Sequence, residues 1–197
     1  ISTGEFLIAE GKGDYIDKLL QSLKPKEVIY QRSRRSKFEE DFGSSFYTFA
    51  LDDWAFNVDY AHELLNKKFD TTSLKGFGIS DLTDGIIAAG VALHYLNETK
   101  HHQTQHILGI RRIEQEKYVW MDRFTINNLE LFSSPNQGAI TLLDVLDDTK
   151  SAMGARMLRR WLALPLKDKK KISKRHQVVE ELHSSNEISE ILSSEIS

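Results

Sequence analysis

The 197-residue sequence contains no cysteine. Without thiols the chain forms no disulfide, no thiolate zinc site and no cysteine nucleophile. No stretch approaches the ~18 consecutive apolar residues of a membrane-spanning helix, so we expect no membrane contact. A signal peptide is also missing, and together these absences favour a cytoplasmic protein.

The two ends of the sequence also lack features that we expect of a complete protein. The first residues, Ile1-Ser2-Thr3-Gly4-Glu5-Phe6, contain no initiating methionine. Near the other end, apolar stripes have too few partners in the sequence to bury them. We therefore expect the chain to be a piece of a longer protein, with room for one large or two small globular domains.

Charge is nearly balanced overall but unevenly distributed. The net charge is -3, whereas the window 155–175 holds nine basic residues against the single acid Asp168, which makes it +8 and leaves -11 for the rest. Such a window is compatible with phosphate contact, although a solvated helical face, or one docked on an acidic domain, is the commoner explanation. The basic residues of the window are Arg156, Arg159, Arg160, Lys167, Lys169, Lys170, Lys171, Lys174 and Arg175.

The front of the chain mixes strand and helix patterns. An apolar run at 5–9, a helix capped by Asp14 and a second apolar run at 28–30 predict a parallel strand pair with a right-handed crossover. A further strand is expected at 46–51, followed by a helix that Asn57 caps.

The most apolar segment runs from Gly85 to Leu96 and predicts a central helix capped by Asp84. Gly90 lies inside this segment, where glycine costs about 1 kcal/mol relative to alanine. We interpret Gly90 as the place where another element approaches closely. The short segment 76–78, with glycine at both ends, instead predicts a turn.

From about Gln115 the pattern is helical, apart from one last strand expected at Tyr118 to Met121. Helices are expected after the caps Thr141 and Ser151, and Pro165 ends the second of them. The sequence therefore predicts an α/β part followed by an all-α part.

Few residues suggest chemistry. The histidines of the segment 101–106 have a spacing that zinc accepts, but a polar junction after a helix end is the better interpretation. Asp52, Asp53 and Asp59 are the acids that a magnesium-dependent nuclease would use, and a solvated loop face is again the stronger explanation. No phosphate-binding or hydrolase motif is present.

Longer motifs occur at residues 73–79, 85–99, 121–131, 141–147 and 153–166. Together they resemble the bacterial MutS family of DNA mismatch-recognition proteins. Residues 73–79 and 85–99 resemble the family's connector domain. Residues 121–131, 141–147 and 153–166 resemble the start of its core, or lever, domain. The motifs follow the family's order over nearly the whole chain, which short chance matches would not do.

The resemblance implies an RNase H-like α/β connector domain at 1–112, a mixed sheet with flanking helices that lacks the family's first strand. An all-α partial core domain would follow at 113–197. Such a module is not an enzyme: it couples the binding of mismatched DNA to an ATPase domain and offers a surface for MutL. ATP and magnesium would be cofactors of the full-length protein, and none is expected here. Other MutS domains, a second MutS subunit and mismatched DNA would be its further partners.

The resemblance also suggests partner surfaces. We expect a partner-facing or interdomain surface at the exposed end of the central helix, formed by His94, Asn97, Glu98 and His101. Two alternatives to the connector and lever interpretation stay open, namely an RNase H-like nuclease and a standalone basic DNA-binding module. The arginines Arg156, Arg159 and Arg160 are further candidates for a partner or interdomain surface. The lysines Lys169, Lys170 and Lys171 are candidates for contact with DNA or another domain.

Overall fold

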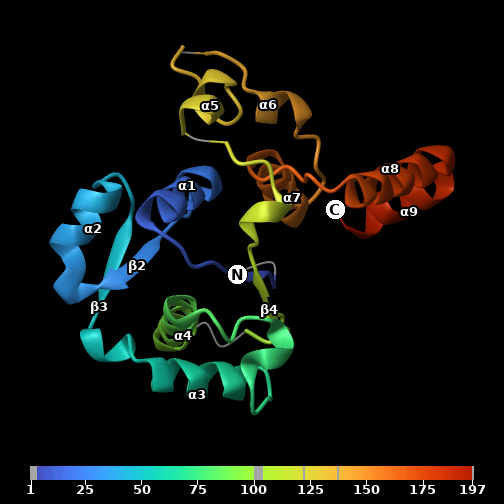
Figure 1. Ribbon diagram of the computed structural model, residues 1–197. Helices are drawn as coiled ribbons and strands as arrows, with labels where there is room; N and C mark the ends of the chain where they lie inside the picture. Colours follow the sequence, from blue (N-terminus) through green and yellow to red (C-terminus); the bar gives the residue numbers. More distant parts are fainter. Residues whose placement is uncertain (1–3, 100–103, 122, 137, 197) are drawn as a thin grey trace. The chain divides into compact units, whose positions relative to one another are not determined.

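The computed structural model describes residues 4–99, 104–121, 123–136 and 138–196 (Figure 1). The chain divides into two compact units. The first spans Ile1–Leu20 and Lys24–Ile113, and the second spans Gln21–Leu23 and Glu114–Ser197. Among the described residues, no helix is both long and apolar enough to cross a membrane.

The first unit is mixed α/β, as the sequence predicts. It alternates short strands with helices, and 3-10 turns connect several of them. Its elements are β1 Phe6–Ile8, α1 Gly13–Leu23 without its last three residues, β2 Val28–Gln31, η1 Arg32–Arg34, α2 Arg35–Phe42, β3 Thr48–Leu51, η2 Asp53–Ala55, α3 Val58–Lys68, η3 Leu74–Phe77, α4 Thr83–Glu98 and β4 Ile110–Arg112.

Strand pairing differs from the sequence prediction. In the described residues the strands form two separate parallel pairs, β1 with β4 and β2 with β3, instead of one mixed sheet. The expected pairing of β1 with β2 is wrong, because β1 takes β4 as its neighbour with Phe6 opposite Ile110. The strand β4 has no counterpart in the sequence prediction, since it is only three residues long.

Helix caps were predicted with mixed success. Asn57 caps α3 as expected, because its side chain accepts hydrogen bonds from the N–H groups of Asp59 and Tyr60. Asp14 and Asp84 are not caps: α1 and α4 begin earlier, and both acids lie in the first turn. There their negative charge still stabilises the helix through its dipole.

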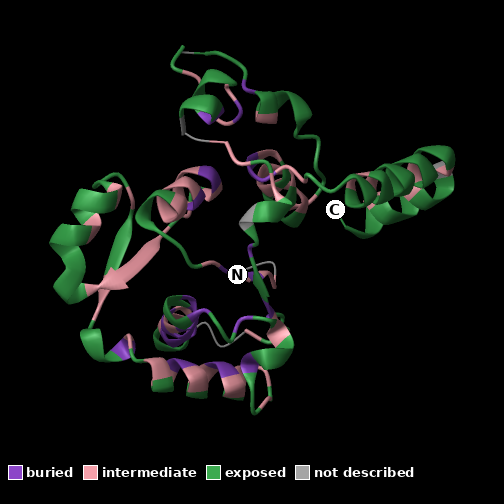
Figure 2. Ribbon diagram, in the orientation of Figure 1, coloured by how far each residue is buried: buried purple, intermediate pink, exposed green. Residues whose placement is uncertain are grey.

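The core of the first unit lies where α4 packs against α3 and β1 (Figure 2). Gly90 has the role that the sequence predicts. A Cβ atom added to Gly90 would lie 2.5 Å from Cβ and 2.6 Å from Cα of Ala61, so the two helices touch through glycine and alanine. The buried cluster contains Phe6, Ile8, Ala61, Leu65, Leu74, Ile79, Leu82, Ile86, Ala89, Leu93, Ile107 and Ile110.

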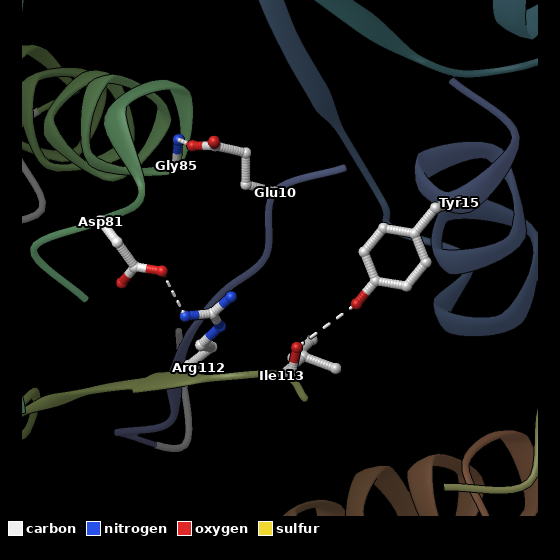
Figure 3. Close-up of polar contacts among 6 residues, drawn as sticks. All are labelled: Glu10, Tyr15, Asp81, Gly85, Arg112 and Ile113. Atoms are coloured by element: carbon white, nitrogen blue, oxygen red, sulfur yellow. Dashed lines mark hydrogen bonds and ion pairs between the residues drawn. The ribbon is translucent and has the colours of Figure 1, made fainter. Parts of the chain in front are cut away.

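A polar contact ties the start of α4 to the segment after β1. The carboxylate of Glu10 accepts a hydrogen bond of 2.9 Å from the N–H of Gly85 (Figure 3). This N–H belongs to the first turn of the helix, which has no partner within the helix itself. Glu10 therefore supplies a hydrogen-bond acceptor for this N–H, which the helix backbone cannot provide.

Two further contacts hold the end of β4, where the chain leaves the first unit. Arg112 forms an ion pair of 2.7 Å with Asp81, and this contact lowers the pKa of the Asp81 carboxyl group (Figure 3). The hydroxyl of Tyr15 donates a hydrogen bond of 3.3 Å to the carbonyl oxygen of Ile113. The last residues of this unit are thus attached to both α1 and the loop before α4.

The second unit is helical. Thr141 and Ser151 cap their helices as predicted, and Thr141 forms a full capping box with Asp144. The segment Tyr118 to Met121 is not a strand: Tyr118 makes only an isolated bridge with Leu166. The elements are η4 Gln115–Lys117, α5 Arg123–Asn128, α6 Leu142–Leu146, α7 Ala152–Ala163, α8 Lys169–Ser184 and α9 Asn186–Glu195.

Replacing Gly90 with alanine is expected to destabilise the first unit by about 1–3 kcal/mol, because the added methyl group meets the backbone of Ala61. The better helix propensity of alanine offsets only about 1 kcal/mol of the clash. Urea unfolding measures the change. Gly13→Ala is the matched control, since a Cβ there meets nothing within 4 Å. Equal stability of the two variants would show that α4 and α3 can separate without cost.

Candidate functional site

A hollow of about 330 Å³ lies beside the C-terminal half of α4. We call it the Trp54 hollow. The end of β3 and the 3-10 turn η2 form one side, and α4 forms the other. His94 and Glu98 both reach it because residues four apart share a helix face. Its lining includes Phe49, Asp52, Trp54, His94, Tyr95 and Glu98.

His94 is buried, with 7% of its surface exposed, which corrects the expectation of an exposed residue. The cause is packing that helix periodicity alone does not reveal. The Nδ1 atom of His94 lies 3.1 Å from the hydroxyl of Tyr60, and the imidazole ring meets Trp54 edge-on with ring centroids 5.0 Å apart. Asn97 and Glu98 are exposed as predicted, and His101 lies outside the described residues.

Trp54 is the residue that the sequence analysis missed. It follows two acids in a 3-10 turn, so no periodic pattern marks it. Its ring packs on His94 and on Tyr60, with 5.6 Å between the centroids of Trp54 and Tyr60, yet 61% of the residue stays exposed. A large aromatic side chain that is held on one side and open on the other is typical of binding surfaces.

Tyr95 supplies a second fixed wall of the hollow. Its hydroxyl donates a hydrogen bond of 2.8 Å to the carboxylate of Glu27, which raises the pKa of Tyr95 because the bond favours the protonated phenol. Phe49 packs on the ring of Tyr95 with centroids 5.0 Å apart. Residues from β3, α4 and the segment before β2 therefore determine the orientation of this ring.

The acids proposed for a nuclease have other contacts in the structure. Asp52 pairs with Arg32 at 2.8 Å, and Asp53 accepts the N–H of Ser33 at 3.2 Å. The hydrogen bond from Ser33 lowers the pKa of Asp53. Asp59 lies in the first turn of α3, where a negative charge stabilises the helix. In the parts of the chain that are described, no three histidine or acidic side chains gather as metal ligands.

The segment with two glycines is a turn, as predicted. It forms the 3-10 helix η3, which Ser73 caps by accepting the N–H of Lys75. Gly78 ends it with φ +67°, a conformation that residues with a Cβ rarely adopt. Of the predicted histidine cluster, residues 101–103 lie outside the described ranges.

In the second unit, the predicted arginine group is split by its contacts. The guanidinium of Arg159 lies over the ring of Phe132, 4.4 Å from its centroid, and burial lowers the pKa of Arg159. Arg175 covers Trp161 in the same way at 3.7 Å. Arg156 is exposed. Arg159 thus packs within its own unit, whereas Arg156 faces solvent.

The predicted lysine group lies at the start of α8. Lys169, Lys170 and Lys171 are exposed, and Asp168 caps the helix by accepting the N–H groups of Lys170 and Lys171. Cations at a helix N-terminus interact unfavourably with its dipole. Asp168 supplies the one compensating charge in the window 155–175.

The second unit also exposes many large apolar side chains, as the unburied stripes in the sequence suggest. Its described helices α8 and α9 have no residue in the buried core (Figure 2). Met157 and Trp161 on α7 are 37% and 38% exposed. Exposed apolar side chains in such number indicate a contact surface.

Arg159→Ala is expected to destabilise the second unit by about 1 kcal/mol, because it removes the cation from the face of Phe132 together with its packed stem. The matched change Arg156→Ala is expected to stay within about 0.5 kcal/mol, since Arg156 is exposed. Chemical unfolding followed by circular dichroism compares the two. Equal losses in both variants would contradict a packing role for Arg159.

Two protein families match consecutive parts of the chain. The family described as MutS domain II matches residues 1–108, and the family described as MutS domain III matches residues 124–197. The first range falls within 1–113 and the second within Glu114–Ser197, the main segment of the helical unit.

Curated relatives point the same way. DNA mismatch repair protein MutS of Flavobacterium johnsoniae is 56% identical over 188 residues, which is 95% of this chain and 22% of the relative. The protein of that name from Christiangramia forsetii is 57% identical over 188 residues, with the same shares covered. That of Cytophaga hutchinsonii is 50% identical over 196 residues, covering all of this chain and 23% of the relative. The chain thus spans less than a quarter of the length of these relatives.

Proposed function

This chain belongs to the MutS family, and we propose that it is the part of a MutS protein that couples mismatched-DNA binding to an ATPase domain. The observation that carries the proposal is the succession of two compact units, each covered by a different MutS domain match. The first unit would be the connector and the second the beginning of the helical lever. The chain itself would catalyse no reaction.

The interior of the proposed connector is packed closely enough for this unit to move as one rigid body. Its helix α4 packs closely on α3 at Gly90, and Arg112 and Ile113 are held by side chains from earlier in the unit. Domain motions of this kind turn packed bodies about short connections. We assign the RNase H-like fold to this unit by family resemblance, and a non-catalytic role because Asp52 and Asp53 bind Arg32 and Ser33.

The proposed lever has the surface that interdomain packing needs. Large apolar side chains on α7, α8 and α9 are exposed, and soluble proteins rarely leave apolar surface of this extent uncovered. We propose that other MutS domains cover it. Arg156 and the lysines Lys169–Lys171 would pair with acids there or with DNA phosphates.

The remaining assignments follow from the same proposal. Mismatched DNA and a second MutS subunit would be bound through other MutS domains, and ATP with magnesium would act in the ATPase domain. MutL would dock on the connector surface near Asn97 and Glu98, both of which are exposed. The working compartment would be the cytoplasm, where DNA repair takes place in bacteria.

Lengthening the connection between the units tests the coupling. We expect two glycines inserted after Ile113, in a full-length MutS relative carrying this chain, to abolish most of the stimulation of ATPase activity by mismatched DNA. Basal ATPase activity and mismatch affinity should change less than about twofold, since no folded unit is altered. The matched control inserts two glycines after Ser44, in an exposed loop of the first unit. Full stimulation after the Ile113 insertion would contradict the proposal.

Direct DNA binding is the second candidate, because the lysines of α8 are exposed. We expect the isolated chain to show no micromolar duplex binding at physiological salt, since its net charge is -3. Replacing Lys169, Lys170 and Lys171 with glutamine should then leave a titration unchanged, as should the control replacement of three exposed lysines in the first unit. Steeply salt-dependent binding lost only in the α8 variant would favour a DNA-binding module. The control lysines are Lys37, Lys67 and Lys75.

A further inference from the structure

We propose that the Trp54 hollow binds a lysine or arginine side chain presented by a partner protein. The inference rests on the proposed function in one respect, namely that this face of the connector meets a partner. It goes further by naming the chemistry of the group that enters the hollow.

The aromatic walls fit a cation. Trp54 is the best of the aromatic side chains for cation–π contact, and its exposed surface borders the hollow. His94 and Tyr60 pack against the indole and hold it in place. A wall that is already fixed loses little conformational entropy when the cation arrives.

Two carboxylates bring negative charge to the hollow. Glu98 lines it from α4 and has no hydrogen bond or ion pair with any residue that the structure describes. Asp52 lines it from the end of β3, where Arg32 neutralises its charge at 2.8 Å. Because Asp52 is already paired with Arg32, Glu98 remains as the acid for an incoming cation.

The size of the hollow indicates one long side chain. Its 330 Å³ lies at the lower end of the range of small-molecule pockets, about 300–1,000 Å³. Phe49, Leu51 and Tyr95 offer an apolar wall for the methylene stem of lysine or arginine. The charged end then reaches Trp54 and Glu98. This combination of apolar wall and acidic rim favours a side chain of a protein over a compact inorganic or small organic cation.

A second hollow in the same unit, of about 370 Å³, does not carry a comparable inference. Two cations, Arg34 and Lys37, and two carboxylates, Asp41 and Asp84, line it together with aromatic rings. Its lining therefore selects no ligand of one charge. The Trp54 hollow is the better defined of the two because its charge and its aromatic walls select the same kind of group.

A peptide titration with the intact chain tests the proposal. The probe is a short glycine peptide that contains arginine, and its control replaces arginine with citrulline, which has the same shape but no charge. We expect the arginine peptide, and not the citrulline peptide, to shift the indole N–H signal of Trp54 in an NMR titration. The Trp54→Phe variant identifies that signal among the three tryptophans.

Matched charge variants distinguish binding in the hollow from a general attraction of the peptide to acidic side chains. Glu98→Gln should weaken binding of the fluorescently labelled arginine peptide roughly three- to fivefold, as expected for one exposed ion pair. Glu40→Gln removes the same charge from the exposed surface of α2 and should leave affinity unchanged. Trp54→Ala should weaken binding further than Trp54→Phe, because phenylalanine keeps an aromatic face.

Three results would overturn the inference. They are a shift of the Trp54 signal by the citrulline peptide that equals the shift by the arginine peptide, equal affinities of the Glu98→Gln and Glu40→Gln variants, and no shift at millimolar arginine peptide. These outcomes are independent of the proposed coupling, because the titration needs neither DNA nor ATP. The glycine insertion after Ile113 leaves the hollow intact, so each proposal can fail alone.

Discussion

The close crossing of α4 over α3 is the contact on which the first unit depends. Gly90 and Ala61 touch there without intervening side chains, so the two helices approach until their neighbouring residues pack. One turn beyond Gly90, His94 meets Tyr60, which precedes Ala61 in the chain. A larger residue at the crossing would separate the helices and open this contact as well. The orientation of Trp54, which rests on both His94 and Tyr60, therefore depends on the absence of a side chain at Gly90.

Sequence reasoning succeeded where a residue acts on its near neighbours. Asn57 and Thr141 cap helices through N–H groups two or three positions away, and such contacts are visible in a short window. It failed for strand pairing, because Phe6 pairs with Ile110 and neither three-residue strand encodes its partner. The core as a whole brings these two distant strands together. The α/β class was therefore predictable from local patterns, while the order of the strands was not.

The candidate sites were also predictable only in part. Helical spacing placed His94 and Glu98 on one face, but burial of His94 depends on Trp54, which lies in a turn 40 positions earlier without a periodic pattern. The basic window was visible in the composition, yet the structure gives its arginines unequal roles, since Arg159 packs on Phe132 from an earlier segment. Charge counting finds such a region, whereas only tertiary contacts show which of its cations are engaged.

The two units differ in how much apolar surface they bury by themselves, and this difference bears on the proposed coupling. The first unit surrounds α4 with a continuous core, so its shape is set internally. In the described part of the second unit, few side chains other than Ile126, Leu131 and Leu164 are buried, and α8 and α9 contribute none. Helices without a buried face take most of their stability from whatever they contact. Contacts made elsewhere therefore shift the arrangement of such helices more readily than that of the first unit. A rigid unit joined to a responsive one transmits a change of contact as a change of position, which is the form of coupling proposed for this chain.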